Sequence, residues 1–267
     1  HDGVARRGLL FSDVAQNSFY SFPMFLSLYY LVAENIAVSI DEQQQLNLNN
    51  VVISKLDENF GAYHHTDAAG YQTMLTYPAL PQSFAFYTLS DLLDDHIPAS
   101  ALKDKIVLFG STAPSLQDFW LLPNGESRYG IEYHAFFISQ LLSVATRSQQ
   151  PIHAISNPLE VVWFILWCLL GSFSGMLRSG IALFASAIVF EMGLLIGLVL
   201  FLLHLSWWLP IVTPFMGWLL SLFLSVFYFF SQSKAERAQL MHLFESHVSS
   251  EVASHLWEVR EQFFSEN

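Results

Sequence analysis

The residues best suited to bind an anion follow a short apolar run at 106–109. This run ends at Gly110, and Ser111 and Thr112 come next. A turn of this kind after a strand can present backbone N–H groups and hydroxyls to a phosphate. However, no Gly-Lys-Ser/Thr ending is present, and Pro114 interrupts the helix start that would complete such a site. Ser111 and Thr112 are therefore kept as candidate ligand-binding residues, and an ordinary turn is the favoured alternative.

A second polar group combines two imidazoles and a carboxylate in His64, His65 and Asp67. Side chains of these types can ligate a metal ion. Adjacent side chains in an extended segment point to opposite sides, so both histidines reach one ion only across a turn. We favour a solvated loop and predict no metal site.

Three carboxylates cluster at Asp91, Asp94 and Asp95. No base or nucleophile accompanies them, so we interpret them as helix caps and solvated charge rather than as a catalytic pair. The single cysteine, Cys168, cannot form a disulfide within the chain or a cysteine-based metal site. We predict no catalytic residue, no catalytic domain and no cofactor in this chain.

The elements that must position these residues alternate between helical and strand-like patterns across residues 1–158. This alternation is typical of an α/β or α+β domain. A segment at 22–34 predicts a buried helix with Pro23 in its first turn. Apolar residues that recur at three and four predict a second helix at 130–144. Short strands are predicted at 8–11, 51–54, 72–77 and 106–109, and the Gln/Asn-rich segment 41–50 is predicted to be a loop.

The composition places the rest of the chain in a membrane. Of the 267 residues, 53% are hydrophobic and 13% are charged, against roughly 25% charged in soluble domains. Between 159 and 230 the charged residues are Glu160, Arg178 and Glu191. Crossing a bilayer takes about 20 apolar residues, and three stretches qualify, at 159–177, 181–203 and 208–230. The predicted fold is thus an α/β (or α+β) domain at 1–158, an all-α three-helix transmembrane segment at 159–230 and a signalling helix within 231–267.

The basic residues beside the spans predict their orientation. Lys and Arg are retained on the cytoplasmic side, and they occur at Arg178 in the first loop and at Lys234 and Arg237 after the third span. This places residues 1–158 outside and 231–267 inside a cell membrane, which we take to be a bacterial inner membrane. Residues 1–158 carry 15 acidic and 7 basic residues, a balance of −8, and no basic run. Membrane lipid is therefore an expected partner, and nucleic acid is not.

One carboxyl group, Glu191, lies near the middle of the second span. A charge there would cost at least a few kcal/mol, so we expect this group to be protonated or paired. It could relay protons or a signal. The favoured alternatives are a neutral carboxyl that hydrogen-bonds across the bundle, or a contact between two copies. Small-xxx-small spacing at 171–175 and 193–197 predicts close helix packing.

Several linked motifs in residues 1–155 resemble the type 2 CHASE domain. The motifs are Asp2-Gly3-Val4 with Arg6-Arg7, Asp67-x-x-Gly70 followed by Tyr77, Lys103-Asp-Lys105-Ile-Val-Leu-Phe-Gly110-Ser-Thr-Ala113, Asp118, Pro123, and Tyr129-Gly-Ile-Glu-Tyr-His134-Ala135 with Ile138 and Leu141-Leu142. The resemblance implies an extracytoplasmic sensory domain that binds an unknown ligand or protein, with Asp118 and His134 as further candidate ligand-binding residues. One departure is Tyr77-Pro78-Ala79, because the family usually has arginine and glycine after this tyrosine.

The segment after the third span looks like the linker that precedes class III adenylate/guanylate cyclase domains. Independently, an apolar stripe at helical spacing predicts a signalling helix that pairs with a copy of itself, as in a homodimer. Its members are Leu240, Leu243, Phe244, Val248, Val252, Leu256, Val259 and Phe263, with a helix restart expected at Ser249-Ser250-Glu251. We expect the output domain to lie beyond Asn267, and the start at His1, without a signal-peptide pattern, to be processed or truncated.

These observations favour a membrane receptor that senses an extracytoplasmic signal and controls a cytoplasmic nucleotide cyclase. A transporter or channel subunit is the main alternative, favoured by Glu191 but weakened by the small number of spans and the large outer domain. An outward-facing anchored enzyme is the third alternative, and it lacks a recognisable nucleophile–base pair or metal motif.

Overall fold

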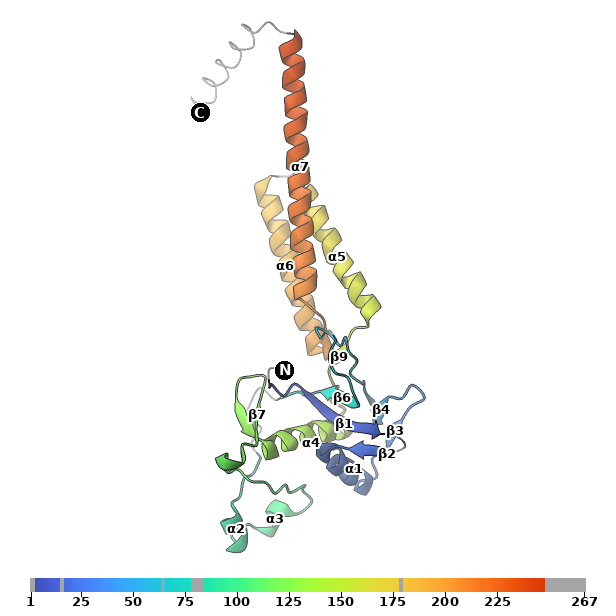
Figure 1. The fold of residues 1–267 in the computed structure, drawn as a ribbon, viewed down its shortest axis with the longest axis vertical. Coiled ribbons are helices and arrows are strands. Elements are labelled where there is room, and N and C mark those ends of the chain that lie inside the picture. Colours follow the sequence, from blue (N-terminus) through green and yellow to red (C-terminus); the bar gives the residue numbers. More distant parts are fainter. Residues whose placement is uncertain (1–2, 15–16, 64, 78–83, 178–179, 248–267) are drawn as a thin grey trace. The chain divides into compact units, whose positions relative to one another are not determined.

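The computed structural model describes residues 3–14, 17–63, 65–77, 84–177 and 180–247, the last four without their side chains. The chain divides into two compact units. We call residues 1–155 together with 201–209 the N-terminal unit, and residues 156–200 together with 210–267 the helical unit (Figure 1). Each is described separately.

Two small three-stranded antiparallel sheets form most of the β part of the N-terminal unit. In the first, β1 (Arg7–Val14) lies between β2 (Asn17–Tyr20) and β6 (Tyr71–Met74), with a register shift between Leu9 and Phe11. The second is the meander β3 (Val38–Ile40), β4 (Leu46–Leu48) and β5 (Val51–Ile53). Two further pairs are the hairpin β7 (Phe119–Leu121) and β8 (Ser127–Tyr129), and the parallel pair β9 (His153–Ala154) and β10 (Trp207–Trp208).

The helices that cover these sheets are α1 (Phe22–Ala33) and α4 (Gly130–Arg147). The Ser21 hydroxyl caps α1 by accepting from the Met24 N–H, and Pro23 stands in the first turn, where its missing N–H costs nothing. The apolar face of α4 carries Tyr133, Phe137 and Leu141 into the core. Shorter helices are α2 (Leu89–Leu93), α3 (Ala99–Leu102) and the 3-10 turn Pro114–Leu116.

The core of the N-terminal unit lies among β1, α1, the meander and α4. Its members include Leu10, Met24, Leu31, Leu48, Ile53, Phe137, Leu141 and Val144. Two polar side chains are built into it. The Gln140 amide donates to the Met74 carbonyl and accepts from the Thr76 N–H, both at 2.9 Å. The Tyr71 hydroxyl donates to the Ile53 carbonyl and accepts from the Leu46 N–H. These bonds join α4 to the end of β6, and β6 to the meander.

Two predictions of secondary structure were wrong. The run 106–109 forms no strand, and Phe109 is 78% exposed. Val107 is also exposed, and Ile106 and Leu108 are half-buried, so the run is not the buried strand that its apolar residues predicted. The predicted loop 41–50 contains β4, because the turn after Asp41, which accepts from the Gln43 and Gln45 N–H groups, leads straight into a pairing with β3 and β5.

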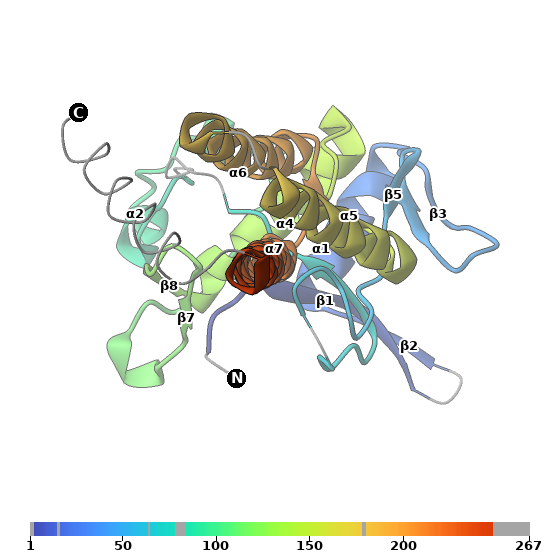
Figure 2. The same ribbon diagram turned by 90° about the horizontal axis from the view of Figure 1, so that it is seen from above.

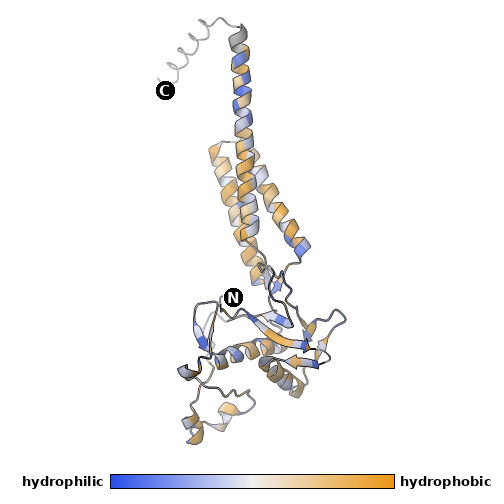
Figure 3. Cartoon of the chain, in the orientation of Figure 1, coloured by the Kyte–Doolittle hydropathy of each residue, from blue (hydrophilic) through white to orange (hydrophobic). Residues whose placement is uncertain are grey.

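The helical unit consists of α5 (Asn157–Met176), α6 (Ile181–His204), whose last residues are grouped with the N-terminal unit, and α7 (Val212–His247). All three are long and apolar enough to cross a membrane. Figure 3 shows the hydrophobic colouring along α5, α6 and the first part of α7, which then becomes hydrophilic. The third helix begins at Val212 rather than at 208, because Trp207 and Trp208 pair with β9 and Pro210 follows. The predicted fold class is confirmed: a mixed α/β region with small sheets precedes three long apolar helices.

Candidate functional site

The first turn of α4 gathers two of the segments that carry candidate residues. The Gly130 N–H donates to the Asp118 backbone carbonyl at 2.9 Å, and the Asp118 carboxylate lies where a Cβ added at Gly130 would stand, so a larger residue would displace this side chain. Gly110 lies against the Ile131 side chain, with equally little room for a Cβ. An anion at a helix N-terminus is stabilised by the helix dipole. The Asp118 carboxylate therefore occupies the position that an anionic ligand would favour.

His134 lies one turn further along α4, between two aromatic rings. Its ring meets the Phe22 and Tyr133 rings edge-on, each at a centroid distance of 5.3 Å. Burial lowers the pKa of His134, and the nearby charge of Asp118 partly offsets this. In the described part of the chain, the buried Nδ1 atom has no hydrogen-bond partner. A neutral imidazole packed among aromatic side chains fits these surroundings.

Ser111 and Thr112 are exposed, as Asp118 is, whereas His134 is half-buried. The Ser111 hydroxyl accepts from the Ala113 N–H at 3.2 Å, a bond within its own turn. The structure thus brings Gly110 and Asp118 to the start of α4 and leaves the two hydroxyl-bearing residues in a solvated turn beside it.

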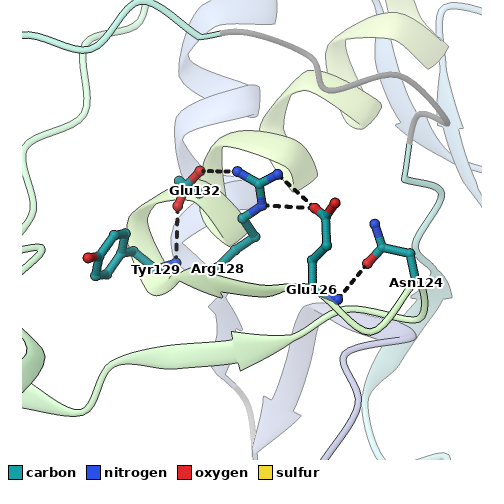
Figure 4. A network of polar contacts seen from close by, with 5 residues as sticks. All are labelled: Asn124, Glu126, Arg128, Tyr129 and Glu132. Carbon is teal, nitrogen blue, oxygen red and sulfur yellow. Dashed lines mark hydrogen bonds and ion pairs between the residues drawn. The ribbon is translucent and has the colours of Figure 1, made fainter.

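An ionic network that the sequence reasoning missed fixes the β7–β8 hairpin to α4 (Figure 4). Arg128 bridges Glu126 at 2.7 Å and Glu132 at 3.3 Å, and Glu132 also accepts from the Tyr129 N–H. The hydrogen bond and charge of Arg128 lower the pKa of the Glu126 carboxyl. The feature of the sequence that could have predicted this network is the spacing of four between Arg128 and Glu132 across a helix start.

In the helical unit, Glu191 connects all three helices. It lies on α6, is 7% exposed, and accepts hydrogen bonds from the Ser174 hydroxyl of α5 at 2.6 Å and the Trp218 indole N–H of α7 at 2.7 Å. Trp167, Leu195 and Leu222 complete the buried cluster around it. Both carboxyl oxygens are thus bonded within the bundle, as the hydrogen-bonding alternative requires.

The two small-xxx-small segments behave differently. Gly171 and Gly175 lie directly against α7, where the Trp218 carbonyl, the Ser225 Cβ and the Leu222 carbonyl leave no room for a Cβ. The end-on view in Figure 2 shows α5 beside α7. Gly193 and Gly197 on α6 have nothing within 4 Å of an added Cβ. One of the two segments therefore serves packing within the described chain.

The comparison with known families decides the class of the N-terminal part. Residues 1–173 match the family described as the CHASE2 domain. The chain belongs to the CHASE2 family. No curated protein and no solved structure matches the chain. The chain is thus a membrane protein with a CHASE2 extracellular sensor domain followed by three long apolar helices.

Two CHASE2 motifs that are far apart in sequence meet in the structure. The Arg7 guanidinium donates to the Asp67 carbonyl at 2.9 Å and to the Gln72 side chain at 3.3 Å. Gly70 has φ +72° and lies under Leu9 of β1, which explains why glycine stands there. The motif at the chain start and the Asp67-x-x-Gly70 motif therefore form one corner of the CHASE2 domain.

Other predicted residues are only partly described. Tyr77 donates to the Ala5 carbonyl at 2.9 Å, while Pro78 and Ala79, where the chain departs from the family pattern, lie outside the described residues. Leu240 and Leu243 of the predicted signalling helix lie on α7 and are exposed. The side chain of Phe244, and Val248, Val252, Leu256, Val259, Phe263 and the Ser249–Glu251 restart, lie outside the described residues. His64 does so as well, which leaves the two-histidine arrangement undescribed.

Proposed function

We propose that this chain is the sensing and membrane-spanning part of a receptor that controls a cytoplasmic class III nucleotide cyclase. One observation carries the proposal: a CHASE2 domain is followed by three apolar helices, the last of which continues unbroken from Val212 to His247, well past the apolar part. A helix longer than the roughly 20 residues needed to cross a bilayer can transmit a displacement to whatever follows it.

The orientation in this proposal rests on basic residues. Arg178 between α5 and α6, and Lys234 and Arg237 on α7, favour a cytoplasmic position for both of these regions. Residues 1–158 are then extracytoplasmic, and the membrane is a bacterial inner membrane. The acidic balance of the CHASE2 domain does not oppose this, since acidic residues contribute little to orientation.

The coding sequence downstream of Asn267 and the activity of its product test the output. We expect a cyclase domain with two metal-binding aspartates, and we expect the full-length protein in membranes to convert ATP or GTP to a cyclic nucleotide. Replacing either aspartate by asparagine should abolish this conversion and leave membrane insertion intact. A reading frame without a cyclase domain would contradict the cyclase proposal.

A transporter or channel subunit predicts a different role for Glu191. Because both oxygens accept hydrogen bonds from Ser174 and Trp218, a glutamine at this position keeps the shape and one acceptor. We expect E191Q to retain signalling in the full-length protein. Loss of ion flux or substrate uptake in proteoliposomes of E191Q, where the unmodified protein shows such transport, would favour the transporter alternative.

We further propose that the receptor is a homodimer that pairs through the stripe begun by Leu240 and Leu243. In a C168S background, L240C should form an intermolecular disulfide under mild oxidation, because paired helices bring equivalent stripe positions together. Q239C, one residue away and off the stripe, is the matched control. Equal cross-linking of the two variants would contradict pairing through this stripe.

The ligand site is proposed to lie at the start of α4. Asp118 and His134 are placed there by Gly130 and the Phe22 and Tyr133 rings, with Ser111 and Thr112 in the adjoining turn. H134N should alter the response of the full-length receptor to its signal more than S111A does, because the unpartnered His134 nitrogen lies in the buried part of this region. An unchanged response of H134N would exclude the site.

A further inference from the structure

A short parallel β pair links segments that stand before and after the first two spans in sequence. We call it the clasp, formed by β9 (His153–Ala154) and β10 (Trp207–Trp208), with Trp207 opposite His153 and Trp208 opposite Ala154. The His153 N–H donates to the Ser206 carbonyl at 2.8 Å, and Ser206 turns the chain with φ +65°. Both strands belong to the N-terminal unit.

The Trp208 side chain is part of the core of the N-terminal unit. It packs in the cluster of Leu56, Phe60 and Met74, and its ring meets the Tyr63 ring edge-on at 5.8 Å. The indole also lies against the backbone of Gly61, where an added Cβ would come within 2.7 Å of Cε3 and where φ is +60°. Gly61 therefore provides the space that Trp208 occupies.

His153 fixes the other strand of the clasp to the meander. Its Nδ1 atom is 3.0 Å from the Ser54 hydroxyl, which directly follows β5, and its ring lies 5.5 Å from the Trp207 ring. Both strands of the clasp therefore contact the rest of the N-terminal unit. Ser54 contacts β9, and Phe60, Gly61 and Tyr63 contact β10.

The chain leads from each clasp strand directly into a span. After β9, two residues precede α5 at Asn157, and after β10, three residues precede α7 at Val212. Within the helical unit, the Trp163 indole of α5 donates to the carbonyl of Pro210, one of those three residues, at 3.2 Å. The glycine contacts of Gly171 and Gly175 with α7 then continue the pairing of the two helices.

We infer that the clasp is the coupling point through which the CHASE2 domain controls α7, the span that leads to the signalling tail. This inference rests on the proposed receptor function. A change in the Phe60–Tyr63 segment that shifts Trp208 moves the start of α7 through the three residues that join β10 to α7. A ligand can drive this only by binding two arrangements of the clasp with unequal affinity.

Disulfide cross-linking tests whether the clasp exists in the membrane-inserted full chain. In a C168S background, H153C with W207C should cross-link rapidly under copper–phenanthroline, because the two positions are direct partners. H153C with F19C is the control, since Phe19 is also exposed but lies on β2, which pairs with β1. Cross-linking of the clasp pair no faster than the control would overturn the inference.

A spin label on α7 tests coupling without any ligand or output domain. The label is placed at M241C, on the exposed hydrophilic part of α7, in C168S protein reconstituted in lipid vesicles. We expect W208A to change the spectrum at this site and W208F, which refills the cluster, to restore most of the original spectrum. W207A, on the same strand but with a half-exposed ring, should leave the spectrum nearly unchanged.

G61A provides a second route to the same result if W208A does not accumulate in membranes. It leaves the Trp208 side chain intact, but the added Cβ displaces the Trp208 ring from Gly61. G61A should therefore change the label spectrum as W208A does. Unchanged spectra in both G61A and inserted W208A would overturn the inference. A spectral response, combined with a full-length reading frame that encodes no cyclase domain, would contradict the proposed function and leave the coupling intact.

Discussion

The N-terminal unit and the helical unit bury polar side chains by different rules. In the N-terminal unit, Gln140 and Tyr71 bond to backbone groups at the ends of neighbouring strands. In the helical unit, Ser174, Glu191 and Trp218 bond to one another. Short strands leave backbone N–H and C=O groups without ladder partners, whereas helices satisfy their own. A buried polar side chain therefore completes the backbone in one unit and joins helices in the other.

The variant expected to have the largest effect on stability is Q140L. It leaves the Met74 carbonyl and the Thr76 N–H without partners in the core, which should lower the stability of the N-terminal unit by about 2–4 kcal/mol. Hydrogen exchange of α4 amides in the full chain under increasing urea measures the loss. Q149L, at an exposed position after α4, is the matched control and should change exchange little. An equal effect of the two variants would contradict the role of Gln140.

The glycine segments give the next largest difference. G171A forces a Cβ against the Trp218 carbonyl, a backbone atom that cannot move alone, and should destabilise the bundle by about 1–3 kcal/mol. G193A meets open space and should be neutral or slightly stabilising, by up to about 1 kcal/mol, because alanine favours helix. Unfolding of the reconstituted protein in dodecyl sulfate measures both. A larger loss in G193A would mean that α6 packs through its glycines.

Substitutions of Glu191 should give a smaller difference in stability, which tests whether buried polar side chains join the helices of the helical unit. E191L leaves the Ser174 hydroxyl and the Trp218 N–H without an acceptor, at a cost of about 0.6–2 kcal/mol in a membrane. E191Q keeps one oxygen and should cost less than half as much. The same dodecyl sulfate titration compares them. Equal losses would show that the carboxyl contributes through charge rather than through acceptor oxygens.

The smallest expected effect is a dependence on pH in the N-terminal unit. Burial lowers the pKa values of His134 and His153, so the folded chain binds fewer protons than the unfolded chain below about pH 6.5. Stability is then fully present above that pH and is lost as pH falls toward the folded pKa values. The free energy of protection of α4 amides, obtained from their exchange after correction for the pH dependence of the intrinsic exchange rate, should fall from pH 7 to pH 5, and less so in H134N. Identical pH profiles would exclude His134 as a contributor.

How much of this follows from sequence depends on the range of each contact. Spacing such as that of Tyr133, Phe137 and Leu141 is local, so the two long helices of the N-terminal unit, α1 and α4, were predicted near their observed bounds. The role of Gln140 was not predicted, because its hydrogen-bond partners are more than sixty residues away in sequence. The strand predicted at 106–109 was wrong for the related reason that an apolar run does not reveal whether a neighbouring strand exists.

In the candidate sites too, local features could be predicted from the sequence and long-range partners could not. The position of Glu191 and the expectation of a partner across the bundle came from hydropathy, but Ser174 and Trp218 could not be chosen among the polar residues of the spans. The clasp was missed entirely, since Trp208 was assigned to the start of the predicted span 208–230. Only pairing with His153 and Ala154, across two helices in sequence, gives them their place in the fold.

Cysteine labelling of membrane vesicles tests the central claim, that a CHASE2 sensor and the helical tail lie on opposite sides of a membrane. The variants are S100C in the CHASE2 domain and Q239C on α7, both exposed positions, each in a C168S background. In right-side-out vesicles an impermeant maleimide should label S100C, and it should label Q239C only after the vesicles are opened. Labelling of both positions from the same side would contradict three membrane crossings and the receptor function proposed for the protein.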